Sequence, residues 1–380
     1  MRAFLFAVLL GVGVCAAEVS VVRVPNGGFK ASAAVDAAGA LHLVYFSGDP
    51  KAGDAFYTTS RDVGATFAAA IRVNSQPRSV QGSSSARGPH LALGRDGRAH
   101  VLWAGSSQAQ PRGPLNPAQA ADSPYNGTPL LYARLDGAAF TPQRNLMTST
   151  IALDGDSALT ADAAGNVFAV WHAMPLDGKG EAERAVWLAA SSDDGATFSP
   201  ERNALPQPTG ACACCGLTAY AGDGALSILY RVAPDGLHRG MSLLTSSDRG
   251  TTFSAQPLDE WKVATCPMST GALLTAADRR ALLAWENDKQ IFYARPPDSP
   301  VAVPGFSGPR KHPALAVNSR GETLIAWTEG IGFGKGGSVA WQQFDAKGQP
   351  LGGTGRAEKL PAHGNVAAAA LGDGRFVVIY

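Results

Sequence analysis

The chain has 380 residues, with 32 Lys and Arg against 31 Asp and Glu, and only 17% of its residues are charged. This length suits two ordinary domains or one large all-β domain. The near-neutral charge argues against non-specific nucleic-acid binding, which requires a basic surface. The 44 Gly and 25 Pro residues are typical of many short strands joined by tight turns.

The first 17 residues have the pattern of an export signal. Arg2 precedes an apolar run over residues 3–14, which is too short to span a membrane. Small residues at 15–17 suit cleavage just before Glu18. We therefore expect residues 18–380 to form one exported domain, secreted or periplasmic, that is monomeric and has no membrane span.

One hairpin pattern recurs seven times along the expected mature chain. Each copy has a small apolar strand, a turn with Asp or Gly, and a strongly apolar strand that often ends in an aromatic residue. The spacing of the copies suits four-stranded blades that bury their faces against one another. The pattern predicts an all-β fold, a β-propeller with seven blades, and six blades are the alternative. The copies are Ala31–Phe46, Pro89–Trp103, Ser157–Trp171, Gly216–Tyr230, Gly271–Trp285, Pro313–Trp327 and Asn365–Tyr380.

The last copy lacks outer strands, and residues 19–24 are expected to supply one and close the ring. In every blade the first strand begins, and the second strand ends, on the same face of the disc. Residues next to these ends should converge at one mouth, where we expect a carbohydrate or other small ligand to bind. The charged and histidine residues placed there are Arg23, Lys30, Asp49, Asp54, Arg87, His90, Asp154, Asp156, His172, Glu181, Glu183, Arg231, His238, Arg239, Glu286, Asp288, Arg310, Lys311, His312, Glu329 and His363.

A second motif follows a strand in three of the copies, at Ser60–Phe67, Ser192–Phe198 and Ser247–Phe253. Aligned on glycine, it reads Ser, a variable stretch containing Asp, Gly, one variable residue, Thr and Phe. A short Asp or Ser side chain can accept backbone N–H bonds inside its own turn, and Gly supplies the unusual dihedral angles. The motif resembles the Asp box, or BNR repeat, of the sialidase superfamily, which implies a structural role for it.

The resemblance to sialidases extends to candidate site residues. The segment Val22–Pro25 is similar to their Phe/Tyr-Arg-Ile-Pro motif and likewise precedes the first blade. This implies that Arg23 belongs to a triad that grips a substrate carboxylate through bidentate pairing, with Arg231 and Arg310 as the best-placed partners. It also implies an Asp acid/base after the first hairpin, for which Asp49 is the nearest match and Asp54 the alternative.

The nucleophile of sialidases is a Tyr that a nearby Glu activates, an exception among glycosidases. Tyr230, Tyr293 and Tyr380 are candidates here, with Glu286 or Glu183 as the partner, and no local motif selects among them. The resemblance predicts an exo-α-sialidase-like glycoside hydrolase. A non-catalytic propeller that binds a ligand or a metal at its mouth is the alternative.

Four cysteines lie at the entry to two adjacent blades, and the expected mature chain has no others. They are Cys212, Cys214 and Cys215, followed by Cys266. Together with the segments Trp261–Cys266 and Arg310–Pro313, this Cys-x-Cys-Cys pattern resembles a group of bacterial exo-α-sialidase-like secreted proteins. The resemblance covers most of the mature chain and implies no particular activity.

The state of the four cysteines is open at the level of sequence. Two disulfides are one hypothesis, in which Cys214 or Cys215 is joined to Cys266, and no cofactor is then required. A second is a thiolate site for Zn or Cu, with Met268 or a histidine such as His312 completing the ligands. Free thiols are the third.

Overall fold

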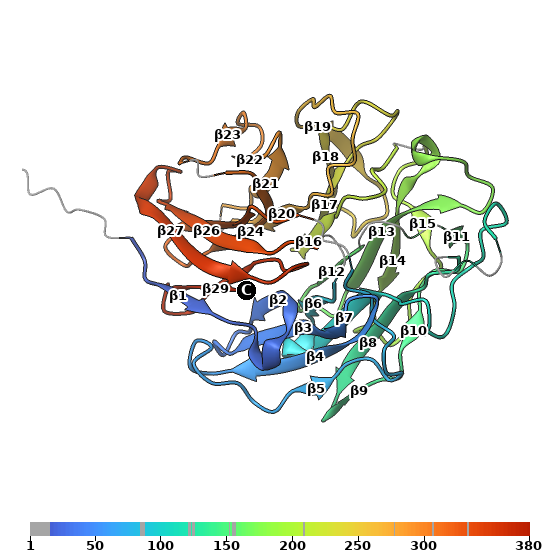
Figure 1. Cartoon of the computed structure of the whole chain (residues 1–380), viewed down its shortest axis with the longest axis horizontal. Helices are drawn as coiled ribbons and strands as arrows, with labels where there is room; N and C mark the ends of the chain where they lie inside the picture. The colour runs from blue at the N-terminus through green and yellow to red at the C-terminus, as the bar shows by residue number, and fades with distance from the viewer. Residues whose placement is uncertain are drawn as a thin grey trace, which may run out of the picture.

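The computed structural model describes residues 16–83, 88–120, 123, 126–151, 153, 157–207, 210–276, 278–305, 308–332 and 334–380. All seven predicted hairpins are formed, and their sheets are arranged as blades around one axis (Figure 1). The fold is a seven-bladed β-propeller, so the six-bladed alternative is wrong. Most of the predicted export signal, up to residue 15, lies outside the described residues, as do Arg87, Asp154 and Asp156.

The first three blades use strands β2 to β15. Two short 3-10 turns, η1 (Pro25–Gly27) and η2 (Arg95–Gly97), lie in this part of the chain. The strands are β2 (Phe29–Val35), β3 (Leu41–Asp49), β4 (Ala52–Ser60), β5 (Ile71–Arg72), β6 (His90–Leu93), β7 (Ala99–Ala104), β8 (Leu130–Asp136), β9 (Ala139–Phe140), β10 (Arg144–Asn145), β11 (Thr150–Ile151), β12 (Ser157–Ala161), β13 (Val167–Pro175), β14 (Ala185–Ser191) and β15 (Arg202–Asn203).

The remaining blades use strands β16 to β29 together with β1, and a third 3-10 turn, η3 (Glu181–Glu183), precedes them. The seventh blade has three strands, the last hairpin and the closing strand, as predicted. The strands are β16 (Thr218–Gly222), β17 (Ala225–Arg231), β18 (Met241–Ser246), β19 (Ser254–Pro257), β20 (Gly271–Thr275), β21 (Ala281–Asn287), β22 (Gln290–Ala294), β23 (Val301–Ala302), β24 (Arg310–Val317), β25 (Thr323–Glu329), β26 (Gly337–Phe344), β27 (Pro350–Leu360), β28 (Ala367–Ala370), β29 (Phe376–Ile379) and β1 (Val19–Val22).

The ring is closed by pairing between the two ends of the chain, as predicted. Strand β1 runs parallel to β29, with Val19 opposite Phe376 and Val22 opposite Ile379. Figure 1 shows the blue β1 beside the red β29. This pairing covers the edge of β29, which would otherwise expose unpaired backbone groups.

The hydrophobic core lies between neighbouring blades and is built largely from the second strand of each blade. Trp103, Trp171, Trp285 and Trp327 lie in these strands and are fully buried. Both faces of such a strand are covered, which explains its continuous run of apolar residues. No helix in the described part of the chain is long and apolar enough to cross a membrane.

Three turns on the outer side of the blades share one hydrogen-bond pattern. In the first, Ser60 Oγ accepts the Gly64 N–H at 2.8 Å, and Asp62 Oδ1 accepts the Thr66 N–H at 2.8 Å. Ser191 and Ser246 fill the serine position in the other two turns. The predicted motif begins at Ser192 and Ser247, one residue too late; each functional serine stands four residues before its glycine, as Ser60 does before Gly64.

Candidate functional site at the mouth of the central channel

The first strands of all seven blades line a cavity of about 630 Å³ along the propeller axis. These strands are β2, β6, β12, β16, β20, β24 and β28. Lys30, His90 and His312 are among the residues that line the cavity, whereas none of its described lining residues is Asp or Glu. A cavity of this size, whose described lining includes a lysine and no acidic residue, can enclose a small anionic molecule.

Two of these residues enter the cavity from irregular backbone. Lys30 has a φ of 58° and His312 a φ of 52°, and in both hairpins the strand register shifts at this point. The left-handed region is uncommon for residues other than glycine, and such residues are often found at functional sites. Lys30 is 2% exposed, and its stem packs on Gly88, where an added Cβ would lie 3.0 Å from the lysine Cδ.

The imidazole of His312 is the clearest candidate for a ligand contact. Its Nδ1 lies 3.3 Å from Thr270 Oγ1, and its buried Nε2 has no hydrogen-bond partner among the described residues. Burial lowers the pKa of His312 to about 3, and the positive charges of Lys30 and Lys311 add to this effect. Burial and the charge of Lys30 also lower the pKa of His363. His312 is therefore neutral at pH 7 and offers a ring nitrogen to which no described residue is hydrogen-bonded.

The guanidinium group of Arg231 is engaged within the protein. It donates to the Arg239 carbonyl oxygen at 2.6 Å and to Asn287 Oδ1 at 2.9 Å, and it lies 4.9 Å from the centre of the Trp261 ring. The residue is 3% exposed. This arginine therefore supports the mouth loops of blades 4 and 5 in this structure.

Arg310 is likewise buried, at the start of β24. It donates to Gln290 Oε1 and to the Val303 carbonyl oxygen, both at 3.0 Å. Its Nε lies 3.5 Å from Glu329 Oε1, and its guanidinium stacks 4.5 Å from the centre of the Trp327 ring. These contacts fix the arginine between blades 5 and 6.

Arg23 lies at the ring closure, where it is exposed. It donates to the carbonyl oxygens of Glu358 and Lys359, both at 2.7 Å, and stacks 4.2 Å from the centre of the Tyr380 ring. The three predicted triad arginines share none of their described partners. The structure therefore does not bring them together around one carboxylate.

The other predicted catalytic residues are also apart. Tyr230 packs in the core between blades 3 and 4, whereas Glu286 belongs to β21 of blade 5. Arg231, which follows Tyr230 in β17, contacts the Glu286 carbonyl oxygen. Successive residues of a strand point to opposite faces, so the Tyr230 side chain points away from Glu286. Tyr230 and Glu286 thus lie on opposite sides of blade 4. Asp49 lies at the exposed end of β3, where its carboxylate accepts the Lys51 N–H at 2.9 Å.

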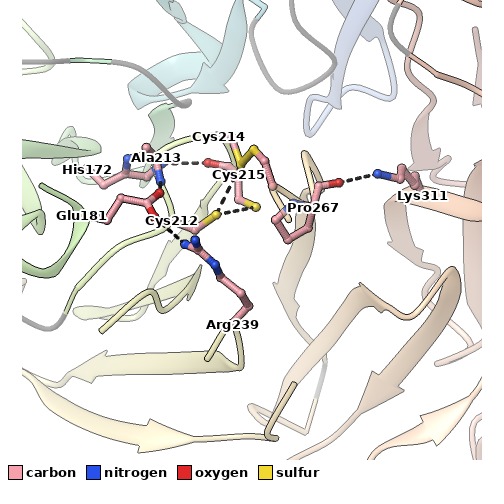
Figure 2. Close-up of a disulfide and its surroundings, with 10 residues drawn as sticks. His172, Glu181, Cys212, Ala213, Cys214, Cys215, Arg239, Pro267 and Lys311 are labelled. Carbon is pink, nitrogen blue, oxygen red and sulfur yellow. Dashed lines mark hydrogen bonds and ion pairs between the residues drawn. A yellow bond between two sulfur atoms is a disulfide. The ribbon is translucent and has the colours of Figure 1, made fainter. Parts of the chain in front are cut away.

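The four cysteines form one group beside the mouth, shown in Figure 2. Cys214 and Cys266 are joined by a disulfide, and Cys212 and Cys215 are free and buried. The Sγ atom of Cys212 lies 3.0 Å from that of Cys215 and 3.5 Å from that of Cys214. The structure therefore combines one predicted bridge with a pair of thiols rather than with a second bridge.

The loop that carries these cysteines is held by polar contacts. Glu181 accepts the Ala213 N–H at 2.9 Å and forms an ion pair with Arg239 at 2.8 Å (Figure 2).

Burial acts to raise the pKa of the Cys215 thiol, but the hydrogen bond with Cys212 and the charge of Arg231 outweigh it and lower the pKa to about 7. The environment therefore favours a thiolate at Cys215.

The sequence placed the histidines at the mouth but gave no indication of Thr270 or Gly88. Thr270 contacts His312, and Gly88 makes room for the Lys30 side chain. Both residues stand directly before a first strand of the repeat. An alignment of the seven copies at the residue before the first strand would have identified both as candidates.

No known family model and no curated protein sequence matches the chain. One solved structure with a similar fold is an α-L-arabinanase from Penicillium chrysogenum in complex with arabinobiose. The match has a TM-score of 0.55 and 14% identity, and it covers 85% of this chain and 95% of that one. The α-L-arabinofuranosidase of Fusarium graminearum matches with a TM-score of 0.52 and 11% identity, over 87% of this chain and 93% of that one. The sialidase of Trypanosoma rangeli matches with a TM-score of 0.49 and 12% identity, over 80% of this chain and 52% of that one. Identities this low show the shared propeller fold alone.

We predict that His312 makes the protein less stable in acid. Its pKa is about 3 in the folded chain and about 6.5 when unfolded, so between these values the unfolded chain binds more protons. Stability is retained above pH 6.5 and is lost as the pH falls, by at most about 1.4 kcal/mol per pH unit from this residue. Urea unfolding of wild type and His312→Asn at pH 7, 5.5 and 4.5 measures the difference.

Asparagine suits the left-handed backbone at this position, so the substitution adds little strain. The variant should show a shallower dependence of the unfolding free energy on pH. Other buried histidines, such as His100, are unchanged in both proteins and cancel in the comparison. An identical pH dependence in the two proteins would mean that His312 takes up its proton as readily folded as unfolded.

Proposed function

We propose that the protein binds a small anionic carbohydrate, such as a sugar acid, at the mouth of its central channel. The observation that carries this proposal is the imidazole of His312, which is 3% exposed and whose Nε2 faces no described hydrogen-bond partner in a cavity that has no described acidic lining residue. Lys30 supplies a positive charge to the same mouth. A carboxylate is the group that this combination would bind most strongly.

Further lining groups suit the rest of a sugar. Asn365 Oδ1 is buried and has no hydrogen-bond partner among the described residues, while the amide nitrogen donates to the Ala31 carbonyl oxygen at 3.2 Å. This oxygen can accept a hydrogen bond from a hydroxyl group. The cavity volume of about 630 Å³ falls in the range of small-molecule sites.

Binding rather than hydrolysis is the proposed activity. The similarity to propeller glycosidases supports a carbohydrate as the ligand class, although at this identity it carries no mechanism to the chain. The sialidase-like arginines and the Tyr230–Glu286 couple are not assembled around the cavity. Sialidase-type hydrolysis is therefore an outcome to be tested beside binding.

Isothermal titration with glucuronate and N-acetylneuraminate tests this proposal. At least one of the two should bind, and its methyl ester should bind more weakly. Lys30→Met should weaken binding about tenfold or more, because a charge-assisted hydrogen bond contributes about 1.5–3 kcal/mol and 1.4 kcal/mol is tenfold. Lys347→Met is the matched control, since Lys347 is exposed in the turn between β26 and β27 on the opposite face.

Two results would contradict the proposal: equal affinity for acid and ester, or equal affinity of wild type and Lys30→Met. The same samples should be assayed for release of a fluorescent aglycone from the corresponding glycosides. Release that is lost in Arg23→Ala and in Glu286→Gln, with folding retained, would replace the binding proposal by a sialidase-type hydrolase.

A second proposal concerns the cysteine group, which we propose can also hold a soft metal ion such as Zn or Cu(I). The Sγ atoms of Cys212, Cys214 and Cys215 all lie within 4.8 Å of one another. Thiolates are preferred ligands of both ions. With the Cys214–Cys266 bridge intact, Cys212 and Cys215 are the two available thiols, and reduction of the bridge adds two more.

Metal analysis after anaerobic titration tests this second proposal. We expect about one ion per chain in the reduced protein, with weaker binding when the disulfide is intact. The ion should be lost on Cys212→Ser or Cys215→Ser. A reduced protein without stoichiometric metal, or one whose metal persists in the double Cys212→Ser, Cys215→Ser variant, contradicts it.

We also propose that the protein is exported. The Cys214–Cys266 disulfide supports this, because such bonds persist mainly in oxidising compartments. Cleavage before Glu18 would leave strand β1 intact for ring closure. N-terminal sequencing of the protein recovered from the periplasm of an expressing bacterium should begin near residue 18. Recovery only from the cytoplasm with residues 1–17 retained would contradict export.

A further inference from the structure

The position of Cys212 within the cysteine group suggests a reaction that neither ligand binding nor metal binding requires. Its sulfur lies beside both other sulfurs of the loop, 3.0 Å from Cys215 Sγ and 3.5 Å from Cys214 Sγ. Cys214 carries the disulfide to Cys266 (Figure 2). We propose that this group is a redox-active site in which Cys212 and Cys215 exchange with the Cys214–Cys266 disulfide.

The first step transfers the bridge within the loop. Cys215 accepts the proton of Cys212 across their 3.0 Å contact. The thiolate of Cys212 formed in this way attacks Cys214 Sγ, a Cys212–Cys214 bond forms, and the Cys214–Cys266 bond breaks. Cys266 leaves as a thiolate and takes up this proton from Cys215, which becomes a thiolate again. Atoms and electrons are conserved, and no outside reagent takes part.

The second step completes the transfer of two electrons. The thiolate of Cys215 attacks Cys212 Sγ, forming a Cys212–Cys215 bond and breaking the bond to Cys214. Cys214 leaves as a thiolate, so the negative charge passes from Cys215 to Cys214. The net result is that the Cys212–Cys215 dithiol is oxidised and the Cys214–Cys266 disulfide is reduced.

The two cysteine pairs differ in burial, so the exchange would connect the protein surface with the interior. Cys212 and Cys215 are each 1% exposed, whereas Cys266 is exposed. External thiols therefore reach the group through Cys266, and the exchange carries electrons between that surface sulfur and the buried dithiol. A bridge with a purely structural role would need no buried dithiol next to it.

The surroundings hold the reacting sulfurs in place. Glu181 binds the Ala213 N–H within the loop and pairs with Arg239 beside Cys212. His172 Nε2 lies 2.7 Å from the Cys215 carbonyl oxygen. None of these contacts uses a sulfur atom, so we expect them to remain in both redox forms.

Trapping the exposed thiol tests the exchange in the mature protein, residues 18–380, which lacks Cys15 and has four cysteines. The protein is equilibrated in glutathione buffer until it has two thiols per chain, freed of glutathione and metal, and incubated with N-ethylmaleimide. Peptide mapping then identifies the labelled cysteines. In wild type we expect Cys266 to become labelled without added reductant, together with the appearance of a Cys212–Cys215 disulfide.

Two serine variants separate the steps. Cys212→Ser removes the attacking sulfur and should slow the labelling of Cys266 at least tenfold. Cys215→Ser allows only the first step, so Cys266 should still be labelled while a Cys212–Cys214 bond accumulates. Thermal melting checks that both variants are folded, and Cys212→Ala serves as a replacement if the serine is not tolerated.

The proposal is overturned if wild type with two thiols per chain is labelled only at Cys212 and Cys215, with the Cys214–Cys266 bond intact. It is also overturned if Cys212→Ser and wild type label Cys266 at the same rate. Neither result depends on ligand binding at the channel, so the exchange can fail while the proposed function holds.

Discussion

Ring closure is the constraint on which the rest of the structure depends. Seven blades enclose a channel only when the first and last strands of the chain meet, and β1 and β29 meet through four residue pairs in parallel register. Arg23 strengthens this junction by binding the carbonyl oxygens of Glu358 and Lys359 and stacking on Tyr380. The wall of the channel, including the basic mouth, is complete because this junction holds.

The irregular backbone at the start of two first strands places the polar side chains at the channel mouth. Register shifts at the start of β2 and β24 turn Lys30 and His312 into the channel through left-handed backbone. The cost of that backbone conformation is about 1–3 kcal/mol at each position. Regular strands would have pointed alternate residues into the packed interfaces between blades instead.

The cysteine group and the channel mouth are neighbours along the chain. The Cys214–Cys266 disulfide anchors the segment that leads to Thr270, and Thr270 contacts His312. The Gly216 N–H also binds the Ser269 carbonyl oxygen at 2.9 Å, which joins the two loops next to the bridge. A change in the state of the cysteines would therefore act first on the part of the mouth that positions His312.

The architecture could be predicted from the sequence because the repeated apolar strands and the turns between them directly reflect which segments are buried. Each hairpin, the seven-blade count and the closing strand followed from apolar runs and turns. The arrangement of Arg23, Arg231 and Arg310 could not be predicted, since backbone carbonyl oxygens that bind a guanidinium leave no pattern in the sequence. The separation of Tyr230 from Glu286 likewise depends on which face of blade 4 each residue occupies. A one-residue difference in the serine turns was hidden because two serines stand side by side at Ser191 and Ser192 and again at Ser246 and Ser247.

The most direct test of the central claim is a crystal structure of the protein grown with a saturating sugar acid such as glucuronate. The account predicts one bound molecule at the channel mouth, with its carboxylate within hydrogen-bond distance of His312 Nε2 or of the Lys30 ammonium group. A molecule bound elsewhere on the propeller, or a mouth filled only by water at a ligand concentration where solution binding is complete, would contradict it.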